Sequence, residues 1–134
     1  MDSFRTSAKT VRIEVNDNGY CVELNTSSDL WLKSFLGFAQ EAQENARKRG
    51  EALQGTDDVD VMINSVIGLD EDLKNGFEKL FGEGSYKETF GYDLVGAEYV
   101  VEFLEACMPY IEKRVEQRTK ALDKYSPNKT GGAR

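Results

Sequence analysis

The first regular pattern in the chain is a strict alternation of apolar and polar side chains over residues 10–26, on both sides of Asn18-Gly19. A period of two is typical of a half-buried strand, and Asn-Gly accepts the positive φ angles of a type I′ turn. The pattern therefore predicts a β-hairpin with one apolar face, which must pack on a helix or on strands of another copy because a lone hairpin is marginally stable. A two-residue turn predicts these cross-strand pairs: Val15 with Val22, and Ile13 with Leu24.

Residues 28–53 have apolar side chains at helical spacing. Ser27 or Ser28 is suited to cap this helix, and Asp29 in the first turn favours the helix dipole. The later turns are rich in charged residues, which predicts a solvated surface. The apolar stripe consists of Trp31, Phe35, Phe38, Ala42 and Ala46.

A second helix is predicted over residues 57–81, with Thr56 or Asp57 as its cap. Gly68 and Gly76 each weaken a helix by about 1 kcal/mol relative to alanine, so we expect a break near Gly68. Gly82 is suited to end the helix. The predicted core positions are Met62, Val66, Leu69, Leu73, Phe77 and Leu80.

A third helical pattern covers residues 94–125, and Pro109 inside it predicts a kink near Ala106. The tail, residues 126–134, has no apolar anchor and is predicted to be disordered, and residues 1–8 form a flexible lead. We therefore expect a single mainly helical α+β domain over residues 9–125. The core positions of the last helix are Ala97, Val100, Val101, Leu104, Cys107, Met108, Ile111, Val115 and Leu122.

The composition of the 134 residues fits a soluble globular domain, with 40% hydrophobic and 31% charged residues. No apolar run approaches the roughly 20 residues that a membrane-spanning helix needs. The first ten residues also lack the apolar stretch that forms the core of a secretory signal. We therefore expect a cytoplasmic protein that does not bind membranes. Cys21 and Cys107 are expected to be small buried residues, not a disulfide or a metal site.

Candidate catalytic chemistry finds little support, because the chain has no histidine to act as a general base or a metal ligand. The glycines of residues 79–91 follow a helix and lack both the third glycine of a dinucleotide loop and the Gly-Lys-Ser/Thr of a phosphate loop. We interpret them as a joint whose aromatic residues pack on the flanking helices. Residues 14–25 lack the terminal acids of a calcium loop. We expect no catalytic residue, no cofactor and no metal.

Acidic and basic residues are unevenly distributed. Residues 56–105 contain thirteen acidic and three basic residues, whereas residues 106–134 contain three and seven. The net charge of −7 argues against nonspecific nucleic-acid binding. Asp57, Asp58, Asp60 and the acids at 70–72 are interpreted as solvated faces and helix-dipole partners, although a divalent-ion site, paired catalytic carboxylates or a nucleic-acid mimic are alternatives.

The segments FEKLFGEGSYKETFG and VVEFLEACMPYIEKRVEQRTKALDKY resemble the small tail assembly chaperones of Gram-positive siphovirus-type phages. In that family a β segment precedes helices, and a Phe-Gly-x-Gly joint separates the last two. The resemblance covers residues 9–125. It implies a non-enzymatic protein that binds the tape measure protein, helps tail tube subunits assemble around it, and leaves before the tail is finished. It also implies the cytoplasm of the infected host and absence from the mature virion.

Two sets of residues follow as candidate contact sites. Aromatic residues around the joint are predicted to hold an apolar helical client: Phe81, Tyr86, Phe90 and Tyr92. Arg114 and Arg118, on the polar side of the last helix, are predicted to contact the acidic region of a neighbouring copy in a homo-oligomer. The alternative function is a phage-encoded acidic protein that binds and inhibits, or triggers, a host defence protein.

Overall fold

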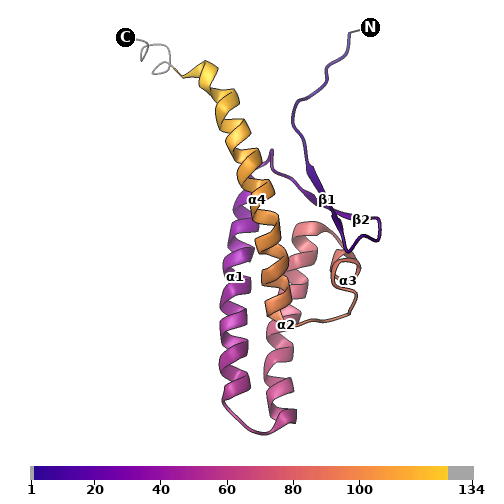
Figure 1. Cartoon of the computed structure of the whole chain (residues 1–134), viewed down its shortest axis with the longest axis vertical. Coiled ribbons are helices and arrows are strands. Elements are labelled where there is room, and N and C mark those ends of the chain that lie inside the picture. Colours follow the sequence, from indigo (N-terminus) through magenta and orange to yellow (C-terminus); the bar gives the residue numbers. More distant parts are fainter. Residues whose placement is uncertain (1, 127–134) are drawn as a thin grey trace.

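The structure, a computed structural model that describes residues 2–126, is a bundle of long helices with a small β-hairpin on one side (Figure 1). This confirms the predicted mainly helical α+β class. Residues 2–10 have no regular secondary structure, and residues 127–134 of the predicted tail lie outside the described part. The elements are β1 (Val11–Val15), β2 (Tyr20–Leu24), α1 (Asp29–Gln54), α2 (Val59–Phe81), α3 (Ser85–Phe90), α4 (Ala97–Leu122) and the short 3-10 turn η1 (Asp123–Tyr125).

The hairpin has the predicted apolar face, but its predicted register is wrong by two residues. Asn16, Asp17 and Gly19 adopt φ angles of 57°, 54° and 86°, so the turn begins at Asn16 and is not a two-residue turn at Asn18-Gly19. The result is a four-residue loop. Because the shift is two residues, every side chain keeps its face. The observed pairs include Ile13 with Val22, Val11 with Leu24 and Val15 with Tyr20.

α1 begins where its sequence predicts. The Ser28 hydroxyl accepts a hydrogen bond from the backbone N–H of Trp31 at 3.2 Å, which confirms this residue as the cap. Phe35, Phe38 and Ala42 are buried, as expected from the apolar stripe. The C-terminal half is mostly exposed, as predicted.

The cap of α2 is Asp58, one or two residues later than the predicted caps, because the Asp58 carboxylate accepts hydrogen bonds from the N–H groups of Asp60 and Val61. The helix then continues through Gly68 without the predicted break. Val66 and Asp70, on either side of that glycine, are both buried, so packing holds the helix together. Gly82 ends α2, as predicted.

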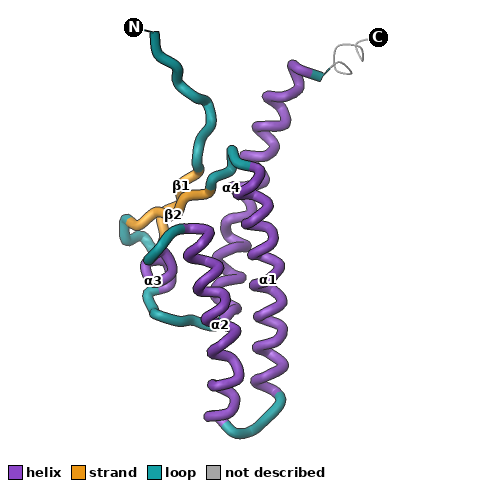
Figure 2. Tube along the Cα trace, turned by 180° about the vertical axis from the view of Figure 1, so that it is seen from behind, coloured by secondary structure: helices purple, strands orange, loops and turns teal. Residues whose placement is uncertain are grey.

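α4 continues through Pro109, and in Figure 1 its C-terminal turns lean away from the bundle. Val115 and Leu122 were predicted to be core residues, but they are 40% and 61% exposed. The reason is the stagger of the helices. Figures 1 and 2 show that α4 extends beyond the start of α1 at one end, whereas the α1–α2 connection extends beyond the start of α4 at the other.

The core lies where α1, α2, α3 and α4 meet under β2. Phe77 is at its centre, with ring centroids 5.7 Å from Tyr86 and 4.6 Å from Phe81. This aromatic cluster fixes α3 and the hairpin against the bundle, as seen from behind in Figure 2. The buried cluster comprises Leu24, Phe35, Phe38, Ala42, Leu73, Phe77, Tyr86, Ala97, Val100, Leu104, Cys107 and Ile111.

Candidate functional site: an aromatic groove beside α4

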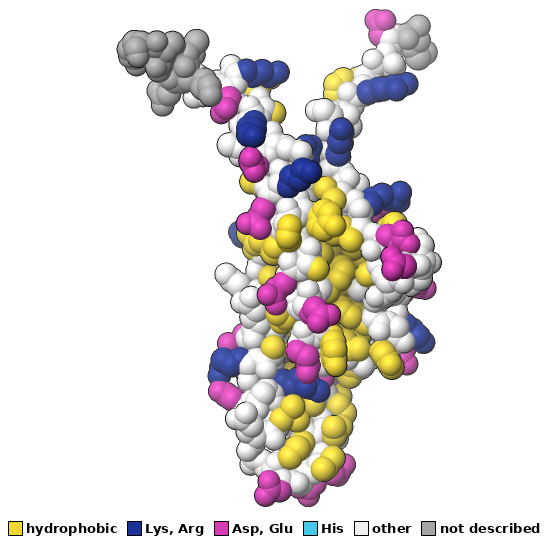
Figure 3. Space-filling view, viewed as in Figure 1, with side chains coloured by type: hydrophobic (Ala, Val, Ile, Leu, Met, Phe, Trp, Pro, Cys, Tyr) yellow, Lys and Arg dark blue, Asp and Glu magenta, His cyan; other side chains and the backbone are white. Residues whose placement is uncertain are grey.

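An open groove runs between α4 on one side and the hairpin loop, α3 and the α3–α4 connection on the other. Its volume is about 690 Å³. Hydrophobic side chains gather along this side of α4 in Figure 3. We call it the aromatic groove; it is lined by Val15, Asn16, Thr89, Phe90, Tyr92, Leu94, Val95, Tyr99, Glu102, Phe103 and Ala106.

Two half-buried phenylalanines connect the aromatic groove to the core. Phe90 and Phe103 have ring centroids 6.0 Å apart, and each contacts Phe77, at 5.3 and 5.6 Å. Edge-to-face and tilted ring pairs of this kind are favourable beyond the apolar area that they bury. The base of the groove is therefore held in place by the folded core.

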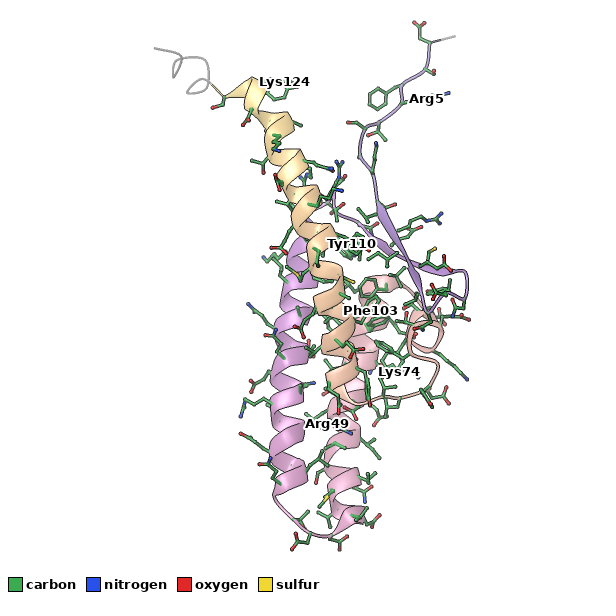
Figure 4. The ribbon with its side chains drawn as sticks, in the orientation of Figure 1. Arg5, Arg49, Lys74, Phe103, Tyr110 and Lys124 are labelled. Carbon is green, nitrogen blue, oxygen red and sulfur yellow. The ribbon has the colours of Figure 1, made fainter. Side chains whose placement is uncertain are left out.

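Exposed tyrosines add flexible apolar surface above that base. Tyr92 in the α3–α4 connection is 68% exposed, and Tyr99 in the first turn of α4 is 54% exposed. Tyr99, Phe103, Ala106 and Tyr110 follow one another at intervals of four, three and four, so they share one stripe of α4. Figure 4 shows Phe103 and Tyr110 projecting from α4 on the side of the hairpin.

The glycine joint sets the position of α3 and with it one wall of the groove. Gly82 and Gly84 have φ angles of 108° and 83°, which other residues rarely adopt, and they reverse the chain between α2 and α3. The buried Tyr86 hydroxyl accepts a hydrogen bond from the N–H of Val95 at 2.8 Å and so ties α3 to the connection that follows it. Burial raises the pKa of the Tyr86 hydroxyl above its ordinary value.

The hairpin loop closes one end of the groove. The Asn16 side chain donates a hydrogen bond to the Thr89 carbonyl at 2.7 Å and joins the loop to α3. The Thr89 hydroxyl is buried and has no hydrogen-bond partner among the described residues. Unsatisfied buried hydroxyls are uncommon, and this one could meet a polar atom of a bound molecule only after a local movement of the groove wall.

Glu102 is the only charged residue among the described residues that line the groove. The remaining lining is aromatic, aliphatic or small and polar. Such a surface fits the apolar face of a helix, whose flanking polar or basic side chains could meet Glu102 at the rim. Its chemistry is that of a binding surface.

The four residues predicted to bind a partner have different environments. Phe90 and Tyr92 line the aromatic groove, whereas Phe81 is half-buried beside Trp31 and Phe103. Tyr86 is fully buried, so it positions the groove and offers no surface in this conformation. The expectation that Phe81, Tyr86 and Phe90 pack on the flanking helices is confirmed.

The two arginines predicted to contact a neighbouring copy also differ. Arg118 donates to the Thr26 carbonyl at 2.9 Å and pairs with Asp29 at 3.0 Å, so it joins α4 to the start of α1. Arg118 is thus engaged within its own chain, and its predicted contact with a neighbouring copy stays a prediction. Arg114 is half-buried and forms no ion pair with a described residue.

Three aromatic residues near the groove were missing from the predicted site: Tyr99, Phe103 and Tyr110. The sequence does contain a signal for them. Their spacing forms a second stripe on α4, next to the core stripe, and a helix with two apolar stripes needs a second partner surface.

The other candidates from the sequence are not assembled into sites. Within residues 2–126, no group of three or more His, Cys, Asp or Glu side chains is arranged to hold a metal ion. Cys107 is buried as expected, which raises its thiol pKa to about 12, but Cys21 is exposed because it lies on the outer face of β2 opposite Glu14. None of the described helices combines the length and apolar character needed to cross a membrane.

No protein family model, no curated protein and no solved structure matches this chain.

Proposed function

We propose that this protein is a non-enzymatic tail assembly chaperone of a phage, and that its aromatic groove holds an apolar helical segment of the tape measure protein while tail tube proteins assemble. The observation that carries the proposal is the groove itself. It combines a base fixed by the aromatic core with exposed tyrosines. The resemblance of the sequence to the tail assembly chaperones supplies the identity of the client.

The physical features of the groove suit reversible binding. Tyrosine side chains supply a large contact area, and ordering them costs little entropy because they have two rotatable side-chain bonds. The groove is open to solvent, so a client can be bound and released without unfolding the chaperone. A chaperone that leaves before assembly is complete needs contacts of this kind.

The test is coexpression with the tape measure protein encoded by the same phage, followed by affinity capture. Tyr92→Ser/Tyr99→Ser removes two exposed groove side chains and should leave the fold intact. Losing two aromatic contacts should reduce the captured tape measure protein about tenfold or more. The matched control is Leu30→Ser/Leu36→Ser, which removes two exposed apolar side chains of α1 outside the groove.

Equal capture by wild type and the groove variant would contradict the proposal, and equal loss in both variants would mean that exposed apolar area alone binds the client. Loss in the groove variant alone would support it.

The alternative, an acidic protein that binds and inhibits or triggers a host defence protein, is less supported. Among the described residues, eight carboxylates form ion pairs with basic side chains of the same chain. On the face shown in Figure 3 the acids are dispersed among apolar and basic side chains. A mimic of nucleic acid needs carboxylates that are free and close together.

A further inference from the structure

The stagger of the helices leaves both ends of the bundle uncovered. Beyond the ion pair between Arg49 and Glu98 near the start of α4, only α1 and α2 continue, and they end in a two-helix projection. We call residues 50–63 the hairpin tip. It consists of the end of α1, the connection to α2 and the start of α2, and it is distinct from the β-hairpin. α2 starts eleven residues before Asp70, so this end of the bundle projects about 16 Å beyond that residue.

The hairpin tip exposes apolar side chains on the stripe that forms the core further along α2. Asp70 and Val66 are buried, and Ile63 and Val59 continue the same stripe at intervals of three and four. Ile63 is 48% and Val59 68% exposed. The core stripe of α2 therefore extends into a region where residues 2–126 supply no third helix.

The hairpin tip is also acidic. Residues 50–67 contain four acidic residues and no lysine or arginine. Asp57 and Asp60 form no ion pair with any described residue. The acids at this end are visible at the bottom of Figure 3.

The opposite end of the bundle has a cavity that is lined in part by basic side chains. A cavity of about 550 Å³ lies between the N-terminal lead and the last turns of α4, and we call it the basic notch. Figure 4 shows Arg5 and Lys124 on the two arms that flank it. Its lining includes Lys9 and Arg114, and it exposes Leu122 and Tyr125 at 61% and 69%.

The surroundings of Arg114 indicate which chemical group the basic notch would bind. Its Nε atom is buried without a hydrogen-bond partner, and its Nη1 atom is 3.4 Å from the Gln117 side chain. No carboxylate of the described residues pairs with it. A partly buried cation without a counter-ion is unfavourable, so a carboxylate from outside the chain would be stabilising here.

We propose that the occupant of the basic notch is the hairpin tip of a second copy. Unpaired acids on the tip would meet unpaired bases of the notch, and the exposed valines and isoleucine of the tip would cover Leu122 and Tyr125. The two surfaces lie at opposite ends of one chain, so the contact is heterologous and repeats from copy to copy, giving a ring or an open filament. This proposal does not rest on the aromatic groove.

Variants that reverse the charge of the hairpin tip or of the basic notch test this contact between copies. The tip variant is Asp57→Lys/Asp60→Lys, and the notch variant is Lys9→Glu/Arg114→Glu. In case the Arg114 change disturbs the fold, Arg5→Glu/Lys9→Glu alters only the N-terminal lead. The control, Glu71→Lys/Asp72→Lys, makes the same charge change as the tip variant at exposed positions away from the tip.

Sedimentation velocity at low salt gives the readout. Wild type should associate, and each tip or notch variant should associate about tenfold more weakly, because attraction between exposed charges becomes repulsion. The control should behave like wild type. Mixing equal amounts of tip and notch variants should restore association, since each junction then joins opposite charges, and added salt should weaken it.

Three results would overturn the proposal: a monomeric wild type at high concentration in low salt, tip and notch variants that associate like wild type, or a mixture that associates no better than its components.

Discussion

The N-terminal half of α2 has seven apolar side chains in eleven residues and the C-terminal half has four in twelve, yet the C-terminal half is the better covered of the two. The C-terminal half, residues 70–81, lies under α1, α3 and α4, and Leu73 and Phe77 are completely buried. In the N-terminal half, residues 59–69, the apolar Val59, Val61 and Ile63 are each at least 48% exposed. An apolar stripe in a sequence thus marks a face that needs a partner, but that partner can belong to the same chain or to another one.

This difference separates stability from association. Side chains in the covered half hold the domain together, and their loss should unfold it. Side chains in the uncovered half should matter little to an isolated copy, but they should matter when a second copy or another protein covers them. Three pairs of measurements test this division.

The largest effect is expected for Phe77→Ala. Phe77 is fully buried and contacts rings from α2, α3 and α4, so truncation should reduce the free energy of unfolding by about 3–5 kcal/mol. The matched change Ile63→Ala should cost less than about 1 kcal/mol. Urea unfolding of dilute protein measures both. Similar costs for the two variants would mean that the uncovered half is packed in solution.

A smaller contrast is expected between the two glycines of α2. A Cβ atom at Gly76 would lie 2.7 Å from the Phe38 ring, whereas a Cβ atom at Gly68 would meet nothing within 4 Å. Gly76→Ala should therefore destabilise the domain by roughly 1–2 kcal/mol, because overpacking exceeds the gain in helix propensity.

Gly68→Ala is the control for this change and should stabilise by about 0.5–1 kcal/mol through propensity alone. Thermal unfolding of both variants gives the comparison. A gain in stability for Gly76→Ala would show that Phe38 does not pack closely on α2.

Local signals predicted the hairpin, the three long helices and most of the core. They did so because alternation, caps and helical spacing are determined by neighbours along the chain. The errors arose where distant segments decide the outcome. Gly68 was predicted to break α2, but packing on α1 keeps the helix continuous. Val115 and Leu122 follow the core period of α4, although none of the described helices covers them.

The candidate site was predicted only in part, for the same reason. Phe90 and Tyr92 lie near the joint in the sequence and were identified from it, whereas Tyr99 and Phe103 belong to the groove only because α4 returns beside α3. The hairpin register depended on which loop residues adopt positive φ, and Asn16-Asp17 is as suited to start the turn as Asn18-Gly19.

The smallest predicted effect concerns Asp70, at the boundary between the two halves of α2. Burial raises its pKa above the ordinary value of 3.8, and the nearby Arg49, 3.4 Å away, offsets this only in part. The folded state therefore binds a proton more tightly than the unfolded state, so this group's contribution to stability falls as pH rises from 3.8 through the raised pKa. Asp70→Asn does not titrate, and Arg49 keeps its pair with Glu98.

The stability of Asp70→Asn relative to wild type should thus increase across that pH range and stay level above it, as measured by urea unfolding at a series of pH values. Glu98→Gln is the control: this exposed partner of Arg49 tests whether loss of an ion pair to that arginine alone gives the same profile. A relative stability of Asp70→Asn that falls with rising pH would show that attraction to Arg49 outweighs the cost of burying the carboxylate, and the boundary of the covered half would then be held by charge and not by packing.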